Sequence, residues 1–344
     1  MSVLACLALA LPGSLSPLGD AVQVELSQRT FRTFQTVLPG DPFRNLGEGF
    51  DLPASFGGHF AVDIAGDGLD IDADGDGSLE THIEGIADKT TGERFGRVVL
   101  QAPGHPAYAV RLRDLGKGWQ WACGGAMVGS IDGLKVQLFD ANGNGTYGDF
   151  GEDAICIGGR SQAGLLSKTM HLNGVLHNVA VSEDGSRLTL DPYAGETGRL
   201  NLEKKLQCEG KLLSALVQSL DGKHCFEMAG EGEGLDLPAG TYRLLQARLG
   251  LGKATVEVQG DAVRPMAVNA GEEQELSWGA PIRAEFEYTY EGGQLTFDPN
   301  KVWLTGAAGE RYVGWAPKGK SPEFTVIERN LGTELTKALF PGSC

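Results

Sequence analysis

An acidic stretch in the first quarter of the chain has the composition of a cation site. Residues 70–80 read DIDADGDGSLE, with aspartates at every second position from Asp70 to Asp76. A twelve-residue calcium loop takes oxygen ligands from positions 1, 3 and 5, turns on a glycine at position 6 and closes on a glutamate at position 12. Carboxylates held this close repel one another, and a divalent cation removes that repulsion. The stretch therefore predicts a calcium site.

Two frames fit this first stretch. One begins at Asp70 and the other at Asp72, and we prefer the second because it places an apolar residue, Leu79, at position 8. Neither frame has a glutamate at position 12, so the closing ligand is expected from Glu80, Glu84 or a neighbouring strand. The expected ligands are Asp70, Asp72, Asp74, Asp76, Ser78, Glu80 and Glu84.

A second stretch, residues 140–153, reads DANGNGTYGDFGED and has the same opening. Asp140, Asn142 and Asn144 take positions 1, 3 and 5, with Gly145 at position 6, and position 12 again carries no acid. We expect weaker binding here because asparagines replace two aspartates. The expected ligands are Asp140, Asn142, Asn144, Thr146, Asp149 and Asp153.

Both stretches resemble the calcium loops of EF-hand, dockerin and thrombospondin-type extracellular repeats. The resemblance implies Ca²⁺ as the ion, with a dissociation constant on the order of 0.1 to 1 mM at an extracellular site. The flanking segments, KVQLF before Asp140 and AICI after Asp153, read as strands rather than helices. The competing interpretation is an ordinary turn without an ion, because aspartate, asparagine and glycine are all good turn formers.

Catalytic motifs are weak by comparison. His171 and His177 lack a metal-spaced carboxylate, and residues 159–164, GRSQAG, only faintly resemble a nucleophile elbow. Glu231 and Glu233 are one acidic pair among many, so they point to no glycosidase. Trp119 and Trp121 alternate and suit a strand core better than a face for stacking sugars.

The elements that must position these loops read as strands. Apolar residues alternate in short runs, and the 51 glycines favour tight turns. The segments VAVSEDGSRLTL and IRAEFEYTYEGGQLTFDP predict hairpins, because Asp-Gly and Gly-Gly steps tolerate positive φ. Only 203–219 and 332–339 are candidate helices. The predicted fold is mainly β, with tandem antiparallel sandwich-like domains and calcium loops inserted between strands.

The expected domain organisation has four parts. Residues 1–21 are expected to be a signal peptide or lipoprotein signal, 22–200 a β-rich domain with both acidic loops, 201–280 a β-sandwich, and 281–344 a β-rich C-terminal segment. Residues 235–250, LDLPAGTYRLLQARLG, resemble a strand of carboxypeptidase-regulatory-like, prealbumin-type sandwiches. The whole chain resembles uncharacterised exported proteins of planctomycete-type bacteria, a likeness that implies no activity.

The amino terminus and the cysteines bear on location. Val3 to Leu11 is too short an apolar run to cross a bilayer but suits a signal peptide, and Cys6 follows a lipobox-like sequence that permits a lipid anchor. No positive charge precedes this run. Of the six cysteines, Cys123 with Cys156 and Cys208 with Cys225 are the economical disulfide pairings.

The charge narrows the possible partners. A net charge of -16 argues against nucleic acid, because phosphate binding needs clustered Lys and Arg. We therefore expect a secreted, periplasmic or envelope protein that binds calcium for structural reasons, with polysaccharide or envelope components as further possible partners and no membrane span. The alternatives are an extracellular hydrolase with structural calcium and a carbohydrate- or surface-binding module.

Overall fold

The computed structural model describes residues 21–40, 42–158, 162–182, 184–314, 323–328 and 330–339. These residues form strands β1 to β33 and one short 3-10 helix, η1 (Ala54–Phe56). Almost all strand pairs are antiparallel; the pairs β19–β27 and β20–β28 are parallel. The mainly-β prediction is confirmed.

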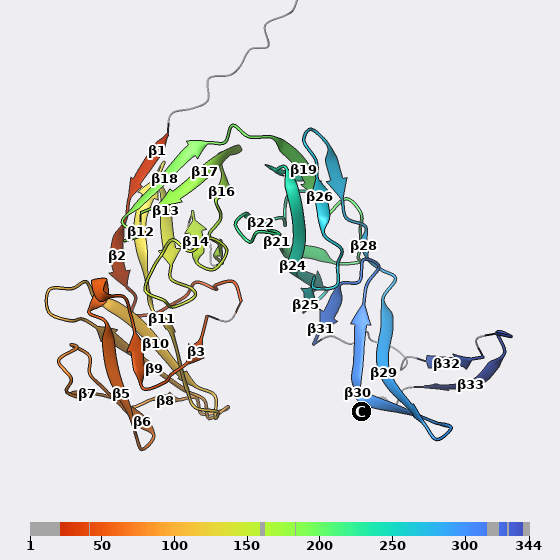
Figure 1. Ribbon diagram of the computed structural model, residues 1–344, viewed down its shortest axis with the longest axis horizontal. Coiled ribbons are helices and arrows are strands. Elements are labelled where there is room, and N and C mark those ends of the chain that lie inside the picture. The colour runs from red at the N-terminus through yellow and green to blue at the C-terminus, as the bar shows by residue number, and fades with distance from the viewer. Residues whose placement is uncertain are drawn as a thin grey trace, which may run out of the picture.

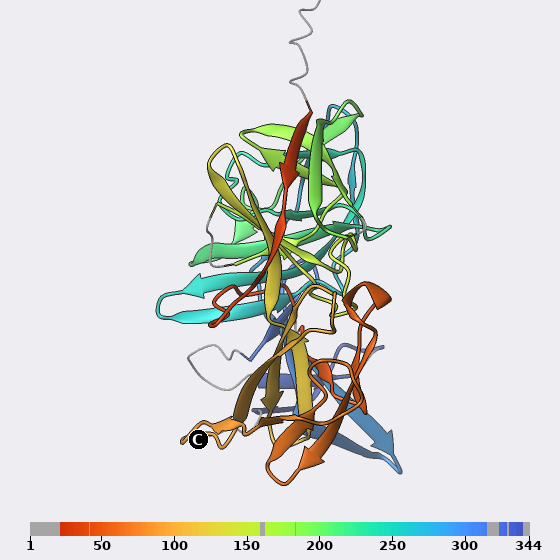
Figure 2. The ribbon, with the colours of Figure 1, turned by 90° about the vertical axis from the view of Figure 1, so that its left-hand side faces the viewer.

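Four sheets build the N-terminal domain (Figure 1). The first contains β1 (Val22–Glu25), β18 (Arg187–Pro192), β17 (Val175–Val181) and β16 (Thr169–Leu172). The second contains β15 (Gly164–Leu165), β14 (Ala154–Ile157), β13 (Leu134–Phe139), β12 (Gly125–Ile131) and β2 (Ser27–Thr30). The third contains β3 (Arg44–Asn45), β11 (Trp119–Cys123), β10 (Tyr108–Asp114), β9 (Arg94–Leu100) and β8 (Ile86–Ala87). The fourth contains β4 (Gly49–Asp51), β5 (His59–Ala65), β6 (Gly68–Ile71) and β7 (Thr81–Ile83). Figure 2 faces this domain, with the orange strands of the fourth sheet at its lower end.

The remaining strands follow in the C-terminal half. One eight-stranded sheet contains β22 (Cys225–Glu227), β21 (Lys211–Ser219), β24 (Gly240–Leu251), β25 (Ala254–Gln259), β31 (Arg311–Val313), β30 (Gln294–Thr305) and β29 (Arg283–Glu291), with β26 (Met266–Val268) paired to β24. Smaller sheets contain β23 (Leu235–Pro238), β19 (Thr197–Asn201) and β27 (Glu273–Glu275), and β20 (Leu206–Gln207) with β28 (Trp278–Gly279). The hairpin of β32 (Glu323–Ile327) and β33 (Glu334–Leu339) forms a separate two-stranded sheet.

Two large apolar cores correspond to the two halves. Buried residues from all four N-terminal sheets, from Val24 to Leu190, form the first core, and residues from Leu200 to Tyr312 form the second. The expected boundary at residue 200 therefore falls inside β19, which belongs to the second half. The expected boundary near 280 lies within one continuous sheet, because β30 and β31 extend the sheet that contains β24 and β25.

Both hairpin predictions are confirmed. Strands β17 and β18 pair Val179 with Leu190 around the Asp-Gly turn. Strands β29 and β30 pair Tyr290 with Leu295 around the Gly-Gly turn. In each case the turn residues fix the register, because glycine adopts the positive φ that a tight hairpin requires.

Both helix predictions are wrong. Residues 203–219 contain β20 and β21, and residues 332–339 contain β33. The run from Ala215 to Ser219 is continuously buried, since β21 lies between β22 and β24. A short, fully buried strand has no alternating pattern, so its periodicity does not distinguish it from a helix.

The economical disulfides do not form. Cys123, Cys208 and Cys225 are all unbridged thiols, and Cys156 packs in a separate small cluster with Phe139. The expected signal segment, except for Ala21, and the lipobox-like Cys6 lie outside the described residues. Within the described ranges, no helix combines the length and apolar character needed to cross a membrane.

Candidate metal centre

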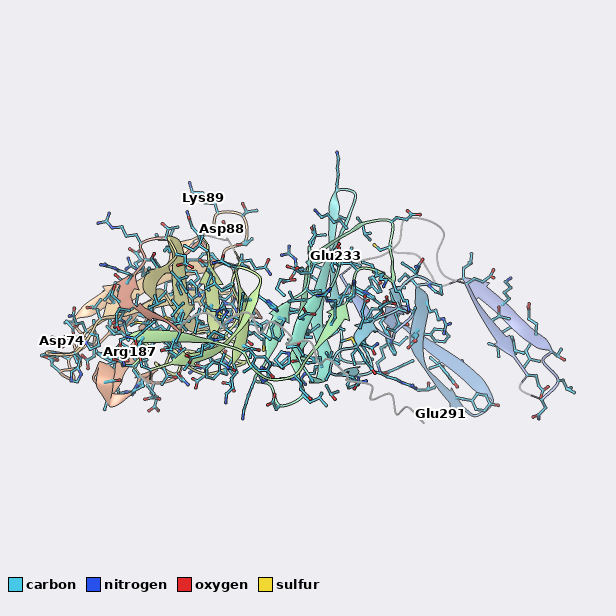
Figure 3. All side chains as sticks on the ribbon, turned by 90° about the horizontal axis from the view of Figure 1, so that it is seen from above. Asp74, Asp88, Lys89, Arg187, Glu233 and Glu291 are labelled. Atoms are coloured by element: carbon cyan, nitrogen blue, oxygen red, sulfur yellow. The ribbon has the colours of Figure 1, made fainter. Side chains whose placement is uncertain are left out.

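The first acidic loop connects two paired strands at the outer end of the N-terminal domain. Ile71, the last residue of β6, pairs directly with Thr81, the first residue of β7. Residues 72–80 therefore form the whole connection. Figure 3 places Asp74 at the end of the molecule farthest from the C-terminal strands.

Four carboxylates of this loop converge. Asp72, Asp74, Asp76 and Glu80 each offer one oxygen, and these four oxygens all lie within 4.8 Å of one another. None of the four forms an ion pair with a described Lys, Arg or His. Two unit charges at such a separation repel by about 1 kcal/mol in water and by several kcal/mol near a protein surface. The loop thus concentrates negative charge that no cationic side chain balances.

Backbone donors hold the opening carboxylate in place. Asp72 is buried, and its Oδ1 accepts from the N–H of Gly75 at 2.7 Å and of Asp76 at 3.1 Å, while its Oδ2 accepts from Gly77 at 3.0 Å. Gly75 and Gly77 have φ of 74° and 92°, a backbone region in which only glycine is unstrained. These glycines allow the chain to curl around Asp72.

Glu80 closes the loop. Its Oε1 accepts from the N–H of Ala73 at 2.9 Å and from the hydroxyl of Thr81 at 3.1 Å. The Ala73 donor lowers the pKa of Glu80 below its ordinary value, so the carboxylate is charged at neutral pH. Glu80 is the residue immediately before β7, which explains why the loop needs no acid at position 12.

The other expected ligands of the first loop lie outside this cluster. Asp70 is part of β6, and its Oδ1 lies 2.6 Å from Nδ1 of His82 on the paired strand. Ser78 donates its backbone N–H to Asp76, and Glu84 is exposed beyond the end of β7. Leu79 is 43% exposed, so it does not serve as the buried apolar position expected of the Asp72 frame.

The second loop repeats the same construction. Phe139 of β13 pairs directly with Ala154 of β14, and residues 140–153 connect them. Asp140 accepts from the N–H of Asn144 at 3.0 Å and of Gly145 at 2.7 Å, and Asp153, immediately before β14, accepts from Ala141 at 3.1 Å. Each loop therefore has an opening aspartate directly after one strand and a closing acid directly before the next.

The two loops differ in how they neutralise charge. In the second loop, Nδ2 of Asn142 and of Asn144 and the Thr146 hydroxyl all donate to Oδ2 of Asp149, at 3.1, 2.7 and 2.6 Å. Partial burial alone would raise the pKa of Asp149, but together these three donors outweigh it and hold the pKa below its ordinary value. In the first loop the corresponding residues, Asp74 and Asp76, are carboxylates and have no hydrogen to donate. The amide groups therefore offset carboxylate charge in the second loop, whereas in the first loop a bound cation would have to offset it.

Burial sets the protonation of the second loop. Asp140 and Asp153 are both 0% exposed. Burial raises the pKa of Asp140, although Tyr108 donates its hydroxyl to the Asp140 carboxylate at 2.5 Å. Burial raises the pKa of Asp153 to about 8, and the nearby Asp140 and Asp149 carboxylates act in the same direction. Burial and the neighbouring carboxylates therefore favour the protonated form of Asp153 more than they would at an exposed aspartate.

Tyr108 is a site residue that the loop sequences do not reveal. It lies 32 residues before Asp140 on β10, in a different sheet, and packs edge-on against Phe56 of η1. Its phenol was not predictable from loop spacing, because nothing in the sequence relates β10 to the second loop.

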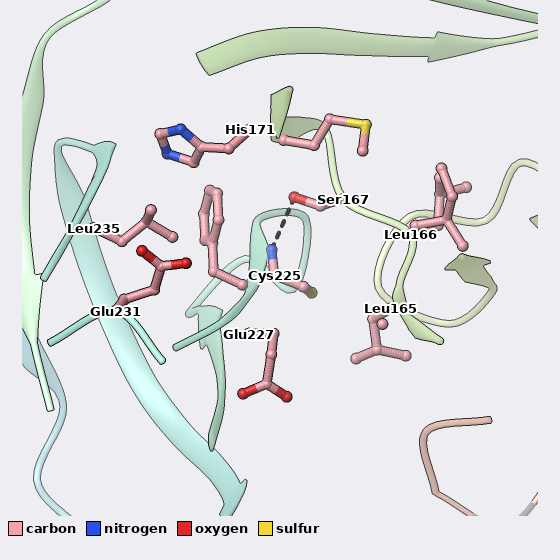
Figure 4. A pocket seen from close by; sticks show the side chains of 12 residues that line it. Leu165, Leu166, Ser167, His171, Cys225, Glu227, Glu231 and Leu235 are labelled. Atoms are coloured by element: carbon pink, nitrogen blue, oxygen red, sulfur yellow. Dashed lines mark hydrogen bonds between the residues drawn. The ribbon is translucent and has the colours of Figure 1, made fainter. Parts of the chain in front are cut away.

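The candidate catalytic residues do not assemble. A cavity of about 200 Å³ between the two halves is lined by Ser167, His171, Cys225, Glu227 and Glu231, among others (Figure 4). The Ser167 hydroxyl oxygen accepts hydrogen bonds from the backbone N–H groups of Cys225 and Thr169. Nε2 of His171 lies 2.7 Å from the carbonyl oxygen of Asp236. Burial raises the pKa of the Cys225 thiol to about 11. No nucleophile in this cavity is activated by a described base.

The remaining candidates have structural positions. His177 is buried and its Nδ1 lies 2.9 Å from the Val175 carbonyl. Trp119 and Trp121 are both buried in the first core, as expected, and so present no face to a sugar. In the GRSQAG segment, residues 159–161 lie outside the described ranges.

Comparison with known proteins finds no matching family model, no similar curated protein and no similar solved structure.

Proposed function

We propose that this chain is an exported calcium-binding β protein in which one Ca²⁺ ion has a structural role at the first acidic loop. The observation that supports this most directly is the convergence of four carboxylate oxygens within 4.8 Å with no cationic side chain among them. An ion held there joins the two ends of the connection between β6 and β7. We infer the structural role from the position of the loop, because it connects β6 to β7, the last strand of the fourth sheet of the N-terminal domain.

The donor set favours calcium over other metals. The four ligands are hard carboxylate oxygens, and neither thiolate nor imidazole belongs to the cluster. Calcium accepts six to eight oxygens at flexible spacing, so backbone carbonyls and water can complete its shell. Magnesium demands near-ideal octahedral geometry and retains its own water. An exposed site of this kind suits the millimolar calcium outside a cell, which agrees with the proposed export.

The second loop is proposed as an ion-free counterpart. Its Asp149 carboxylate is already satisfied by the Asn142 and Asn144 amides and the Thr146 hydroxyl, and Asp140 and Asp153 are buried with raised pKa values. A cation there would have to displace these donors. We therefore assign the ion to Asp72, Asp74, Asp76 and Glu80 alone.

Calcium is expected to stabilise the chain against heat. A ligand that binds only the folded state at about 100 times its Kd adds about 2.7 kcal/mol to the free energy of unfolding. Thermal melting in EDTA and then in 10 mM CaCl₂ should show a higher midpoint with calcium. The double variant Asp72→Ala plus Asp74→Ala should show the same midpoint in both buffers.

Two control variants separate the loops. Glu84→Ala, beside the cluster but outside it, should keep the full calcium response. Asn142→Ala plus Asn144→Ala should keep it too, at a lower baseline. An identical midpoint for the wild-type chain with and without calcium would contradict the proposal.

A further inference from the structure

A second cavity, on the face of the eight-stranded sheet, has the chemistry of a ligand site. It is an open pocket of about 380 Å³, within the usual range for small-molecule pockets, and most of its lining residues are exposed. Strands β25, β31, β30 and β29, which lie side by side in Figure 1, provide most of its wall. Its polar and aromatic lining consists of Gln259, Asp261, Glu285, Trp303, Thr305 and Arg311.

The register brings these side chains onto one face of the sheet. Glu285 pairs directly with Trp303, and Arg311 pairs with both Gln259 and Thr305. Residues paired across neighbouring strands point to the same side of a sheet. The cavity is thus built on rigid strands, with only Asp261, Ala262 and Gly309 coming from connections.

Glu285 is a fixed acceptor in this cavity. Its Oε2 accepts from Nε1 of Trp303 at 3.2 Å, and its Oε1 accepts from the Thr305 hydroxyl at 2.9 Å. Each carboxylate oxygen can accept two hydrogen bonds, so one site on each oxygen remains for a ligand. Two adjacent hydroxyl groups match this pair of acceptors.

Arg311 offers donors that the described residues do not use. Its guanidinium lies over the Trp303 ring, with Cζ 4.8 Å from the ring centroid. Within the described ranges, no hydrogen bond or ion pair joins this guanidinium to another side chain. Five N–H donors therefore stand beside an aromatic ring and a prepared acceptor.

We propose that this cavity binds a neutral, hydroxyl-rich saccharide. A sugar ring has an apolar C–H face, which can pack against Trp303, and hydroxyls that both donate and accept hydrogen bonds. Glu285 and Asp261 accept from these hydroxyls, and Arg311 and Gln259 donate to them. A uronic acid polymer fits less well, because the chain carries a net charge of -16. This inference does not depend on calcium.

The test uses the full chain on an array of neutral and uronate oligosaccharides, followed by calorimetric titration with the best neutral binder. We expect Trp303→Ala and Glu285→Gln to weaken binding about tenfold or more, which corresponds to 1.4 kcal/mol. Tyr290→Ala is the matched control, since Tyr290 is an exposed aromatic residue on β29 that does not line the cavity. Its affinity should equal that of the wild-type chain.

Several outcomes would overturn the proposal. These are no binding to any neutral oligosaccharide, a preference for uronates, or wild-type affinity in both cavity variants. Thermal melting of each variant shows whether it folds, and the near-isosteric Glu285→Gln provides a test if Trp303→Ala does not. Titration in EDTA should give the same affinity as in calcium, and a requirement for calcium would overturn the assignment to this cavity.

Discussion

Replacing Asp140 by alanine is expected to lower the free energy of unfolding of the N-terminal domain by about 3 to 5 kcal/mol. The substitution removes the acceptor for two buried donors, the Tyr108 hydroxyl and the Gly145 N–H, whereas the N–H of the exposed Asn144 keeps Asn142 Oδ1 as an acceptor. Each donor left buried without a partner costs about 1 to 3 kcal/mol. Urea titration followed by hydrogen exchange of peptides from β10 and β13 localises the loss to this domain.

Two companion variants calibrate this result. Tyr108→Phe removes one donor and leaves Asp140 with its backbone partners, so it should cost about 1 to 2 kcal/mol. Asn144→Ala alters an exposed side chain of the same loop and should cost less than about 1 kcal/mol. If Asp140→Ala costs no more than Asn144→Ala, then Asp140 does not organise the loop as described.

The sequence predicted the class of fold and the two loops because both depend on local signals. Alternating apolar residues and Asp-Gly or Gly-Gly steps predict strands and hairpins at short range, and β17–β18 and β29–β30 form with the expected pairing. The loop openings are equally local, since positive φ at Gly75 and Gly77 recurs at Gly143 and Gly145. Such features need no knowledge of distant residues.

Local reasoning named Glu80 and Glu84 as alternative closing acids of the first loop without choosing between them, and it did not locate the domain boundary. Strand pairing decides which acid closes each loop, because Glu80 and Asp153 immediately precede Thr81 and Ala154, the first paired residues. Position 12, where the twelve-residue calcium loop between two helices has its closing glutamate, is therefore not the position of the closing acid in these loops between strands. Likewise, residues 283–313 join a sheet begun at β21, and that pairing has a long sequence separation. The saccharide cavity depends on the same long-range register.

The second loop should make the stability of the calcium-free chain depend on pH. Asp153 has a pKa of about 8 in the folded chain and an ordinary value of 3.8. Between these values the folded state binds more protons than the unfolded state, so the free energy of unfolding falls as pH rises. The contribution of Asp153 to this slope cannot exceed about 1.36 kcal/mol per pH unit, and we expect it to be roughly 1 kcal/mol per unit between pH 5 and 8. Urea titrations in EDTA across this range measure it.

Asp153→Asn isolates this contribution, because the variant lacks the titrating group while the neighbouring Asp140 and Asp149 keep their carboxyl groups. The free energy of unfolding of this variant should vary less with pH than that of the wild-type chain. The difference in slope should equal the Asp153 contribution, roughly 1 kcal/mol per pH unit. Asp88→Asn, in which the removed group has a lowered pKa and is not among the carboxylates that raise the pKa of Asp153, should keep the wild-type slope. Equal slopes for the wild-type chain and Asp153→Asn would show that Asp153 is already ionised.

Added calcium distinguishes the two loops. If only the first loop binds the ion, calcium raises the free energy of unfolding at every pH and leaves its slope against pH unchanged. If calcium abolishes the slope, the cation replaces the proton at Asp153, and the second loop is a calcium site as well.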